Sequence, residues 1–203
     1  MTAPAPSDEQ LIARCRKGDA RSFEGLVGRH QERVFNTVYR MVGSYEEACD
    51  LTQEAFLNAY RGLARFRGGA KFSTWMYRIA LNAAYSHLRR QAARPKTVTL
   101  QTTGGDENDP RGEPPAREDG PAVMAENREE ARLMSEALMR LGAQERELVV
   151  LRDLQGRDYE EMAEILGCPL GTIKSRLHRA RSALRDLVLP KIAPETRDAA
   201  RGE

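Results

Sequence analysis

The chain has 203 residues, of which 31% are charged, 40% hydrophobic and only 6% aromatic, a composition that predicts an all-α protein of one large or two small domains. The net charge is only +2, so whole-chain electrostatics do not by themselves indicate nucleic acid. The sequence lacks the run of ~20 apolar residues that a membrane span needs, and it lacks a signal-peptide core. Its three scattered cysteines (Cys15, Cys49 and Cys168) argue against a disulfide framework. We therefore expect a cytoplasmic protein with reduced cysteines and without membrane insertion.

The first half of the chain is expected to form amphipathic helices. Ser44-Tyr45-Glu46-Glu47 has the form of a capping box, so a helix is expected to begin there. Its apolar residues recur at three- and four-residue steps (Ala48, Leu51, Ala55, Ala59 and Leu63), and Gly68-Gly69 is expected to end it. A second helix is expected from near Ser73 to about Arg90. Gly18, Gly43 and the Gly68-Gly69 pair are expected to separate the helices, so the pattern predicts a bundle of short helices.

The segment from Pro95 to Ala122 is dense in Pro, Gly and acidic residues and has almost no apolar periodicity. Such a segment cannot bury enough apolar surface to offset its ordering entropy, so it is expected to be a flexible linker. The predicted organisation is a first domain at 7–94, an acidic linker at 95–123 and a second domain at 124–189.

The second domain carries a helix-turn-helix pattern. Asp158-Tyr159-Glu160-Glu161 forms another capping-box pattern, which opens a short helix with its apolar residues inward (Met162, Ala163 and Leu166). Gly167 supplies a turn, and Pro169 suits the first position of the next helix. That helix has one apolar stripe (Ile173, Leu177, Ala180, Leu184 and Leu187). A short helix, a turn and a long amphipathic helix are typical of a DNA-binding motif.

Charge is divided unevenly in this second domain. The stretch from Cys168 to Arg185 has five cations and no acid, whereas 144–165 carries mostly acids, which indicates two different partners. Opposite the apolar stripe, four cations project outward (Lys174, Arg176, Arg179 and Arg181), where they could pair with phosphates and reach base edges. A cationic helix face is often merely solvated, but the preceding capped helix and turn favour DNA binding.

Four segments closely resemble signatures of sigma factors of the extracytoplasmic-function type. PLGTIKSRLHRARSALR resembles the recognition helix and LVVLRDLQGRDYEEMAEILG the segment before it, while DLTQEAFLNAYRGLARF and FSTWMYRIALNAAYSHLRR resemble two further signatures. The resemblance covers nearly the whole chain except the termini and the linker. It implies a protein, monomeric when free, that binds the β′ and β subunits of core RNA polymerase and directs it to promoter DNA, without catalytic residues, metal or cofactor. It also implies control by an anti-sigma protein.

The resemblance assigns DLTQEAF to the helix that docks on the coiled coil of the polymerase β′ subunit. Asp50, Gln53 and Glu54 lie at i, i+3 and i+4 and share one outward face, which Leu57 and Arg61 extend. Read from spacing alone, this face is an ordinary solvated helix surface.

By the same resemblance, the stretch from Phe66 to Arg90 would recognise and open the downstream, minus-ten promoter element. Aromatic faces and cations suit unstacked bases and a bare backbone, and the predicted contacts are Arg67, Lys71, Phe72, Trp75, Arg78, Asn82 and Arg89. Whether Trp75 stacks on a base or packs in the core stays open. The predicted contacts to the upstream, minus-thirty-five element are Thr172, Lys174, Ser175, Arg176, Arg179 and Arg181.

The resemblance further implies that the linker threads through the polymerase toward the RNA path. Its six acids against three cations would suit mimicry of RNA, and a plain acidic tether is equally compatible. Two other classes of protein remain: a DNA-binding regulator that never touches polymerase, and a protein that sequesters other regulators. An enzyme is the least favoured class, because the sequence has no nucleophile motif, no phosphate-binding loop and no HExxH motif. The three histidines, His30, His87 and His178, are expected to be surface or DNA-facing residues.

Overall fold

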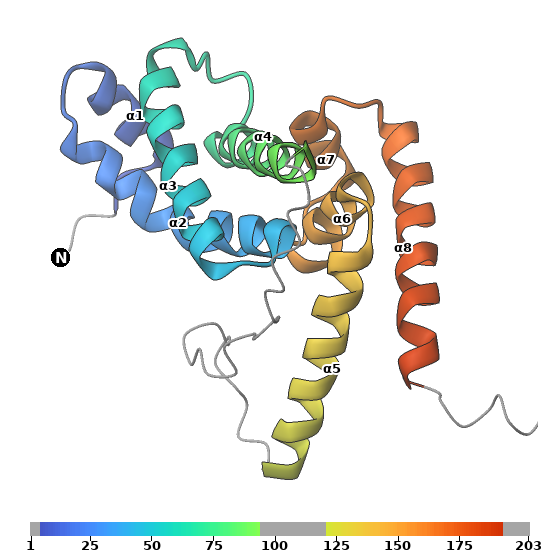
Figure 1. Ribbon diagram of the computed structural model, residues 1–203. Helices are drawn as coiled ribbons and strands as arrows, with labels where there is room; N and C mark the ends of the chain where they lie inside the picture. The colour runs from blue at the N-terminus through green and yellow to red at the C-terminus, as the bar shows by residue number, and fades with distance from the viewer. Residues whose placement is uncertain (1–4, 94–120, 193–203) are drawn as a thin grey trace, which may run out of the picture.

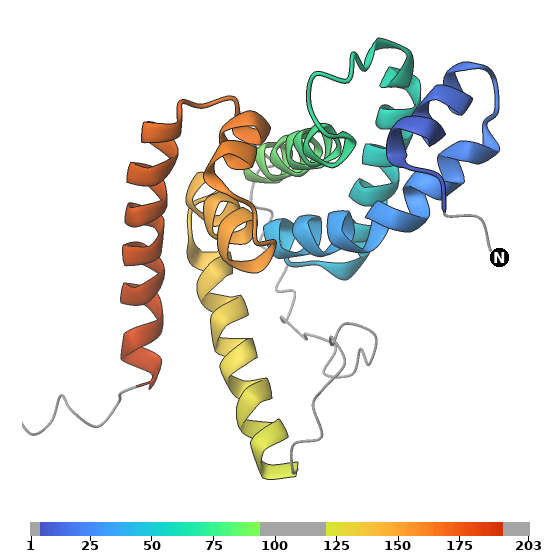
Figure 2. The same cartoon turned by 180° about the vertical axis from the view of Figure 1, so that it is seen from behind.

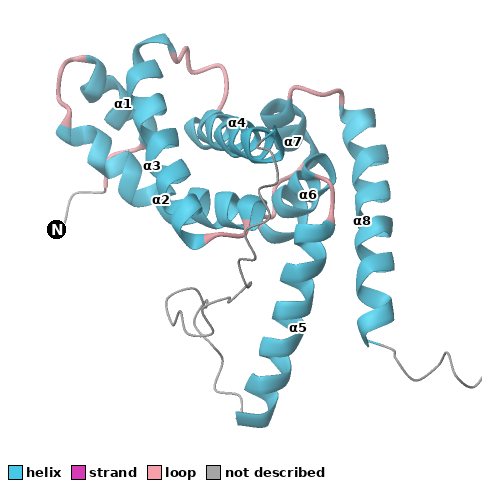
Figure 3. Ribbon diagram, viewed as in Figure 1, coloured by secondary structure: helices cyan, strands magenta, loops and turns pink. Residues whose placement is uncertain are grey.

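The structure is a computed structural model that describes residues 5–93 and 121–192 (Figure 1). Within these ranges every regular element is a helix, so the predicted all-α class is confirmed (Figure 3). The predicted linker lies outside the described residues, apart from its last three positions, which begin helix α5. Among the described helices, none is long and apolar enough to cross a bilayer.

The first domain packs four helices around one apolar core: α1 (Asp8–Arg16), α2 (Arg21–Val42), α3 (Tyr45–Gly62) and α4 (Phe72–Ala93). Ser7 and Gln10 form a full capping box at the start of α1, which the sequence reasoning missed. Gly43 ends α2 with a φ of 81°, a conformation that favours glycine. The apolar side of each helix faces the others because its buried side chains recur every three or four residues.

Helix α3 begins as predicted and ends earlier. The Ser44 side chain accepts a hydrogen bond from the Glu47 amide at 3.4 Å, but the reciprocal half of the predicted box is missing. The Glu47 carboxylate instead accepts from Gln91 at 3.0 Å, on α4. The helix ends at Gly62, well before Gly68-Gly69, and a 3₁₀ turn (Leu63–Arg65) buries Leu63 in the core. Packing of Leu63 therefore decides where α3 ends.

The second domain contains α5 (Pro121–Arg140), α6 (Ala143–Val149) with a π-helical continuation η2 (Val150–Leu154), α7 (Tyr159–Leu166) and α8 (Leu170–Ile192). The long helices α5 and α8 lie side by side and run in opposite directions (Figures 1 and 2). Gly167 ends α7 in the left-handed conformation, with a φ of 63°. The predicted helix-turn-helix is therefore present.

The apolar stripe of α8 is confirmed. Ile173, Leu177 and Ala180 are buried, and Leu184 and Leu187 pack against the core that α5 and α6 contribute. Two local predictions need correction. Pro169 lies just before α8 and is not its first residue. The Glu161 carboxylate was predicted to complete the capping box with Asp158, but it pairs with Lys71 at 3.1 Å.

Two of the three histidines, His30 and His87, lie between helices, so the prediction that they are surface residues is wrong. His30 Nε2 lies 2.8 Å from Asp8 of α1, and His87 Nε2 lies 3.1 Å from Glu47 of α3. Both side chains are mostly buried because the helical repeat turns them toward a neighbouring helix. His178 is exposed, as expected. Cys168 lies in the turn between α7 and α8 and not within a helix.

The two domains share buried side chains. One apolar cluster runs from the first domain into the second, where it includes Leu148, Met162 and Ile165. Arg146 of α6 is buried at 6% exposure and donates to the Leu138, Met139 and Leu141 carbonyls at 2.9, 2.6 and 3.0 Å. It also donates to the carbonyl of Met41, in the last turn of α2. One guanidinium thus satisfies carbonyls at the ends of helices from both domains.

Candidate functional site

The outward face of α3 has the geometry that its spacing predicts. Asp50, Gln53, Glu54 and Arg61 are exposed, and Leu57 keeps 49% of its surface in solvent. The opposite face of the same helix is buried in the core (Ala48, Leu51 and Ala55). An exposed leucine among charged and amide side chains is a combination that suits a protein partner.

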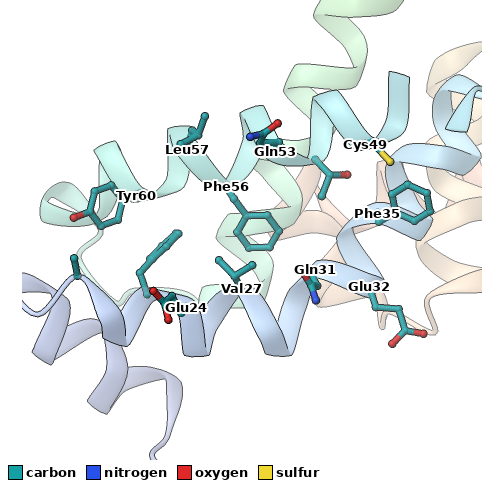
Figure 4. Close-up of a pocket in the computed structure, with 13 residues that line it drawn as sticks. Glu24, Val27, Gln31, Glu32, Phe35, Cys49, Gln53, Phe56, Leu57 and Tyr60 are labelled. Carbon is teal, nitrogen blue, oxygen red and sulfur yellow. The ribbon is translucent and has the colours of Figure 1, made fainter. Parts of the chain in front are cut away.

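An apolar groove runs between α2 and α3, beside this face (Figure 4). Its volume is about 720 Å³, and α3 contributes Gln53, Phe56 and Leu57 to it. Val27 and Phe35 line it from α2, and Phe56 points between the two helices in the close-up. The sequence reasoning found the α3 side and missed the α2 side. The available signal was the set of apolar residues on the otherwise polar side of α2.

Aromatic rings line this groove or, in the case of Tyr39, stack on a ring that lines it. Phe23 packs edge-on against Tyr60 with centroids 5.0 Å apart, and Phe35 stacks on Tyr39 at 6.0 Å. Tyr39 and Tyr60 nevertheless keep 37% and 46% of their surfaces exposed. The groove is therefore a preformed surface with large rings at its margins, where a partner could bury them at little entropic cost.

On α4 and the loop before it, the predicted polar contacts are exposed: Arg67, Lys71, Arg78, Asn82 and Arg89. Phe72 is different, because it is buried at 4% exposure and has no free ring face for a base. We therefore correct Phe72 from a predicted DNA contact to a core residue. Trp75 is half-buried, with its ring centroid 4.9 Å from that of Phe66 and 5.9 Å from that of Phe72. The core side of Trp75 is thus occupied.

The predicted upstream contacts on α8 divide into two groups. Lys174, Ser175 and Arg179 are exposed, while Thr172 is half-buried and its carbonyl accepts from the Ser175 hydroxyl at 3.1 Å. Arg181 is engaged within the protein, since its Nε donates to Asp153 at 3.0 Å. This hydrogen bond raises the pKa of Arg181.

Arg176, the remaining predicted upstream contact, turns toward the first domain. It lines a polar cleft of about 530 Å³ together with Arg78, Asn82 and Arg89 of α4. Glu147 of α6 lies in the same cleft at 7% exposure, and burial raises the pKa of its carboxyl to about 7. Sequence reasoning gave no signal for Glu147, because its environment is made by two domains. Among the described residues, no group of His, Cys, Asp or Glu could hold a metal ion.

A helical bundle with an exposed face on α3 is followed by a helix-turn-helix domain with cations on its second helix, an arrangement typical of a two-domain DNA-binding transcription protein. Residues 26–94 match Sigma-70 region 2, and residues 131–184 match Sigma-70 region 4. The chain therefore belongs to the sigma-70 family, and it is a sigma factor of the extracytoplasmic-function type that directs promoter-specific initiation of transcription.

Relatives and solved structures agree with this assignment. The RNA polymerase sigma-H factor of Pseudomonas aeruginosa is 35% identical over 90% of this chain and 94% of its own length. The ECF RNA polymerase sigma-E factor of Escherichia coli (strain K12) is 38% identical over 92% of this chain and 96% of its own. The structure of CnrH in complex with the cytosolic domain of CnrY is similar with a TM-score of 0.62 and 26% identity, covering 89% of this chain and 96% of that one.

A second solved structure is the sigma factor RpoE in complex with the anti-sigma factor NepR from Bartonella quintana. It is similar with a TM-score of 0.60 and 26% identity, covering 83% of this chain and 97% of that one. The family and the fold are thus matched across both domains of this chain.

Proposed function

We propose that this sigma factor divides its work among three surfaces. The α3 face and the adjoining groove bind core polymerase, α4 and the loop before it open and read the downstream element, and α8 reads the upstream element. The observation that carries the proposal is the apolar α2–α3 groove beside the exposed residues Gln53 and Leu57.

For polymerase binding, the proposed contacts are Asp50, Gln53, Glu54, Leu57 and Arg61. The groove offers apolar area to bury, and the polar side chains at its rim offer hydrogen bonds that fix the register of a partner. The expected partner is the coiled coil of the β′ subunit, since a helical partner can lay an apolar stripe into a groove between two helices.

For the downstream element, the proposed contacts are Arg67, Lys71, Trp75, Arg78, Asn82 and Arg89, now without Phe72. The exposed cations can follow a single strand, and the Asn82 amide can pair with a base edge. Trp75 has one occupied side, so it can offer a base only its outer edge or face. Opening of the duplex is thus proposed to depend on cations and an amide more than on aromatic stacking.

For the upstream element, Lys174, Ser175 and Arg179 are the foremost proposed contacts because they are exposed opposite the buried Ile173 and Leu177. Thr172, Arg176 and Arg181 are proposed to join them once DNA competes for their present neighbours. The acidic linker, whose residues 95–120 are not described, is proposed to run within the polymerase, and an anti-sigma protein is proposed as a regulator. The protein is proposed to act in the cytoplasm, without a cofactor or a catalytic residue.

Co-purification with core RNA polymerase tests the proposal against both alternatives. The chain is expected to co-elute with core polymerase on gel filtration as a one-to-one complex in the absence of DNA. A chain that binds promoter DNA and never co-elutes with core polymerase would be a conventional regulator, and the polymerase-binding surface would be wrong.

A further inference from the structure

A buried hydroxyl group lies in the wall of the α2–α3 groove, on Thr52 of α3. Thr52 keeps only 9% of its surface exposed. Its Oγ1 has less than 1 Å² of accessible surface and makes no hydrogen bond to any described residue. A buried hydroxyl without a partner destabilises a fold, because the hydrogen bonds that it made to water are not replaced. The free fold alone therefore gives this hydroxyl no stabilising role.

Thr37 of α2 shows the arrangement that is usual for a threonine inside a helix. It is fully buried, and its Oγ1 donates to the carbonyl of Arg33, four residues earlier, at 2.9 Å. The corresponding carbonyl for Thr52 is that of Ala48, and no such hydrogen bond forms there. The two threonines are thus a matched pair: both are buried in helices of the same domain, and only Thr37 is satisfied by its own helix.

The Thr52 hydroxyl can reach the groove without a change in the backbone. Thr52 lines the groove while its Oγ1 is inaccessible, so other atoms of this residue form the groove surface. Rotation about χ1 exchanges the positions of the hydroxyl and the methyl group, and threonine in a helix divides between two χ1 rotamers. A partner that offers a hydrogen bond in the groove can therefore draw the hydroxyl to the surface.

The other polar groups at the groove indicate which kind of partner group would meet this hydroxyl. Among the described residues that line the groove, Glu24 and Glu32 are exposed carboxylates, and none is a lysine or an arginine. Gln31 and Gln53 add amide groups from the two helices. Carboxylates without a cation among them attract a partner that carries hydrogen-bond donors, above all the guanidinium of an arginine.

We infer that Thr52 is a specificity-determining residue of this groove, and that its hydroxyl accepts a hydrogen bond from an arginine or amide side chain of the docked polymerase helix. The inference rests on the proposed function, in which the coiled coil of the β′ subunit occupies the groove. A hydroxyl that destabilises the free protein becomes a contact in the complex. A helix with an apolar side chain at this point leaves the hydroxyl unpaired and binds less tightly.

Thr52→Val tests the hydroxyl, because valine has a similar branched shape and lacks the oxygen. Surface plasmon resonance with immobilised core polymerase is expected to show an affinity about tenfold lower than that of the natural chain. The midpoint of urea unfolding, followed by circular dichroism, is expected to rise, since the unpaired hydroxyl is gone from the interior.

Thr37→Val is the matched control. It loses the hydrogen bond to the Arg33 carbonyl, so its urea midpoint should fall while its affinity for core polymerase stays unchanged. Thr52→Ser retains the hydroxyl and removes only the methyl group, so it should bind core polymerase within about threefold of the natural chain. A hydroxyl-dependent contact thus separates affinity from stability, which a purely structural role of Thr52 would not do.

Unchanged affinity of Thr52→Val overturns the inference. An equal loss of affinity in Thr37→Val or in Thr52→Ser also overturns it, because the loss would then come from the fold or from the methyl group. A lower urea midpoint of Thr52→Val would show that the hydroxyl is already satisfied in the free protein, with the same consequence. Failure of the proposed function looks different: the natural chain itself would not bind core polymerase, while the urea midpoints of Thr52→Val and Thr37→Val would still move in opposite directions.

Discussion

Arg146 places a buried charge where four backbone carbonyls converge, and burial lowers the pKa of its guanidinium. We predict that Arg146→Ala lowers the free energy of unfolding by roughly 2–4 kcal/mol, because the carbonyls at two helix ends lose their donors. Urea unfolding followed by circular dichroism measures this loss. Arg140→Ala, an exposed arginine at the end of α5, should change stability by less than about 0.5 kcal/mol. Equal effects of the two variants would contradict the role given to Arg146.

Glu147 makes stability depend on pH. Burial is the main cause that raises its pKa from 4.5 to about 7, while Arg176 and a hydrogen bond with Tyr85 oppose the rise. The folded state therefore holds the proton more tightly than the unfolded state, and stability falls as the pH rises from about 4.5 to 7. The cost of the buried carboxylate is fully present above pH 7 and amounts to ~3 kcal/mol.

Glu147→Gln should remove this dependence. Unfolding free energies measured in urea between pH 5 and 8 are expected to decline with pH in the natural protein and to stay level, apart from other groups, in the variant. The same decline in both proteins would show that Glu147 does not titrate in this window.

At the scale of single elements, α3 is the most direct test of polymerase docking. Asp50→Lys combined with Gln53→Ala should weaken binding to core polymerase by roughly tenfold, or about 1.4 kcal/mol. The fold should be intact, since both side chains are exposed. Asp186→Lys makes the same charge reversal on α8 and serves as the control. Undiminished binding of the double variant would rule out this face.

Helix α8 gives a graded prediction for the upstream element. Arg179 is exposed, whereas Arg181 is held by Asp153. We expect Arg179→Ala to weaken binding to an upstream-element duplex by ~1–3 kcal/mol if it reads a base, and uniformly across sequences if it contacts phosphate. Arg181→Ala should have the smaller effect, because binding first requires its release from Asp153. Fluorescence anisotropy of a labelled duplex measures both, and the reverse order would contradict this placement of α8.

The starts of helices could be predicted from the sequence, whereas their ends and some buried positions could not. Ser44 and Asp158 mark the starts of α3 and α7 because capping is a local interaction. The early end of α3 at Gly62 was not predictable, since it depends on tertiary packing: Leu63, in the 3₁₀ turn that follows, is buried in the core. The burial of Phe72 is hidden for the same reason, because an aromatic residue at the start of a helix fits a core and a DNA surface equally well.

At the scale of the whole molecule, the sequence predicts two helical domains but not their mutual contact. Tyr77 and Arg157 are 80 residues apart in the sequence, and no local sequence pattern around either residue indicates that the two are in contact. Periodicity assigns Tyr77 no partner, and the acids of 144–165 indicate a partner of opposite charge without saying that part of it is α4. Interactions between domains thus require the structure, whereas the exposed α3 face required only helical spacing.

The central claim is that this chain enables core polymerase to open promoter DNA. Its most direct test is permanganate reactivity of unpaired thymines in the downstream element, measured with core polymerase and with or without the protein. Reactivity should appear only with the protein, and Asn82→Ala should reduce it on duplex DNA while core binding is unchanged. A template already mismatched at the downstream element shows whether the variant fails at opening or at strand capture. Absence of reactivity with the natural protein, on a promoter that it binds with core polymerase, would contradict the account.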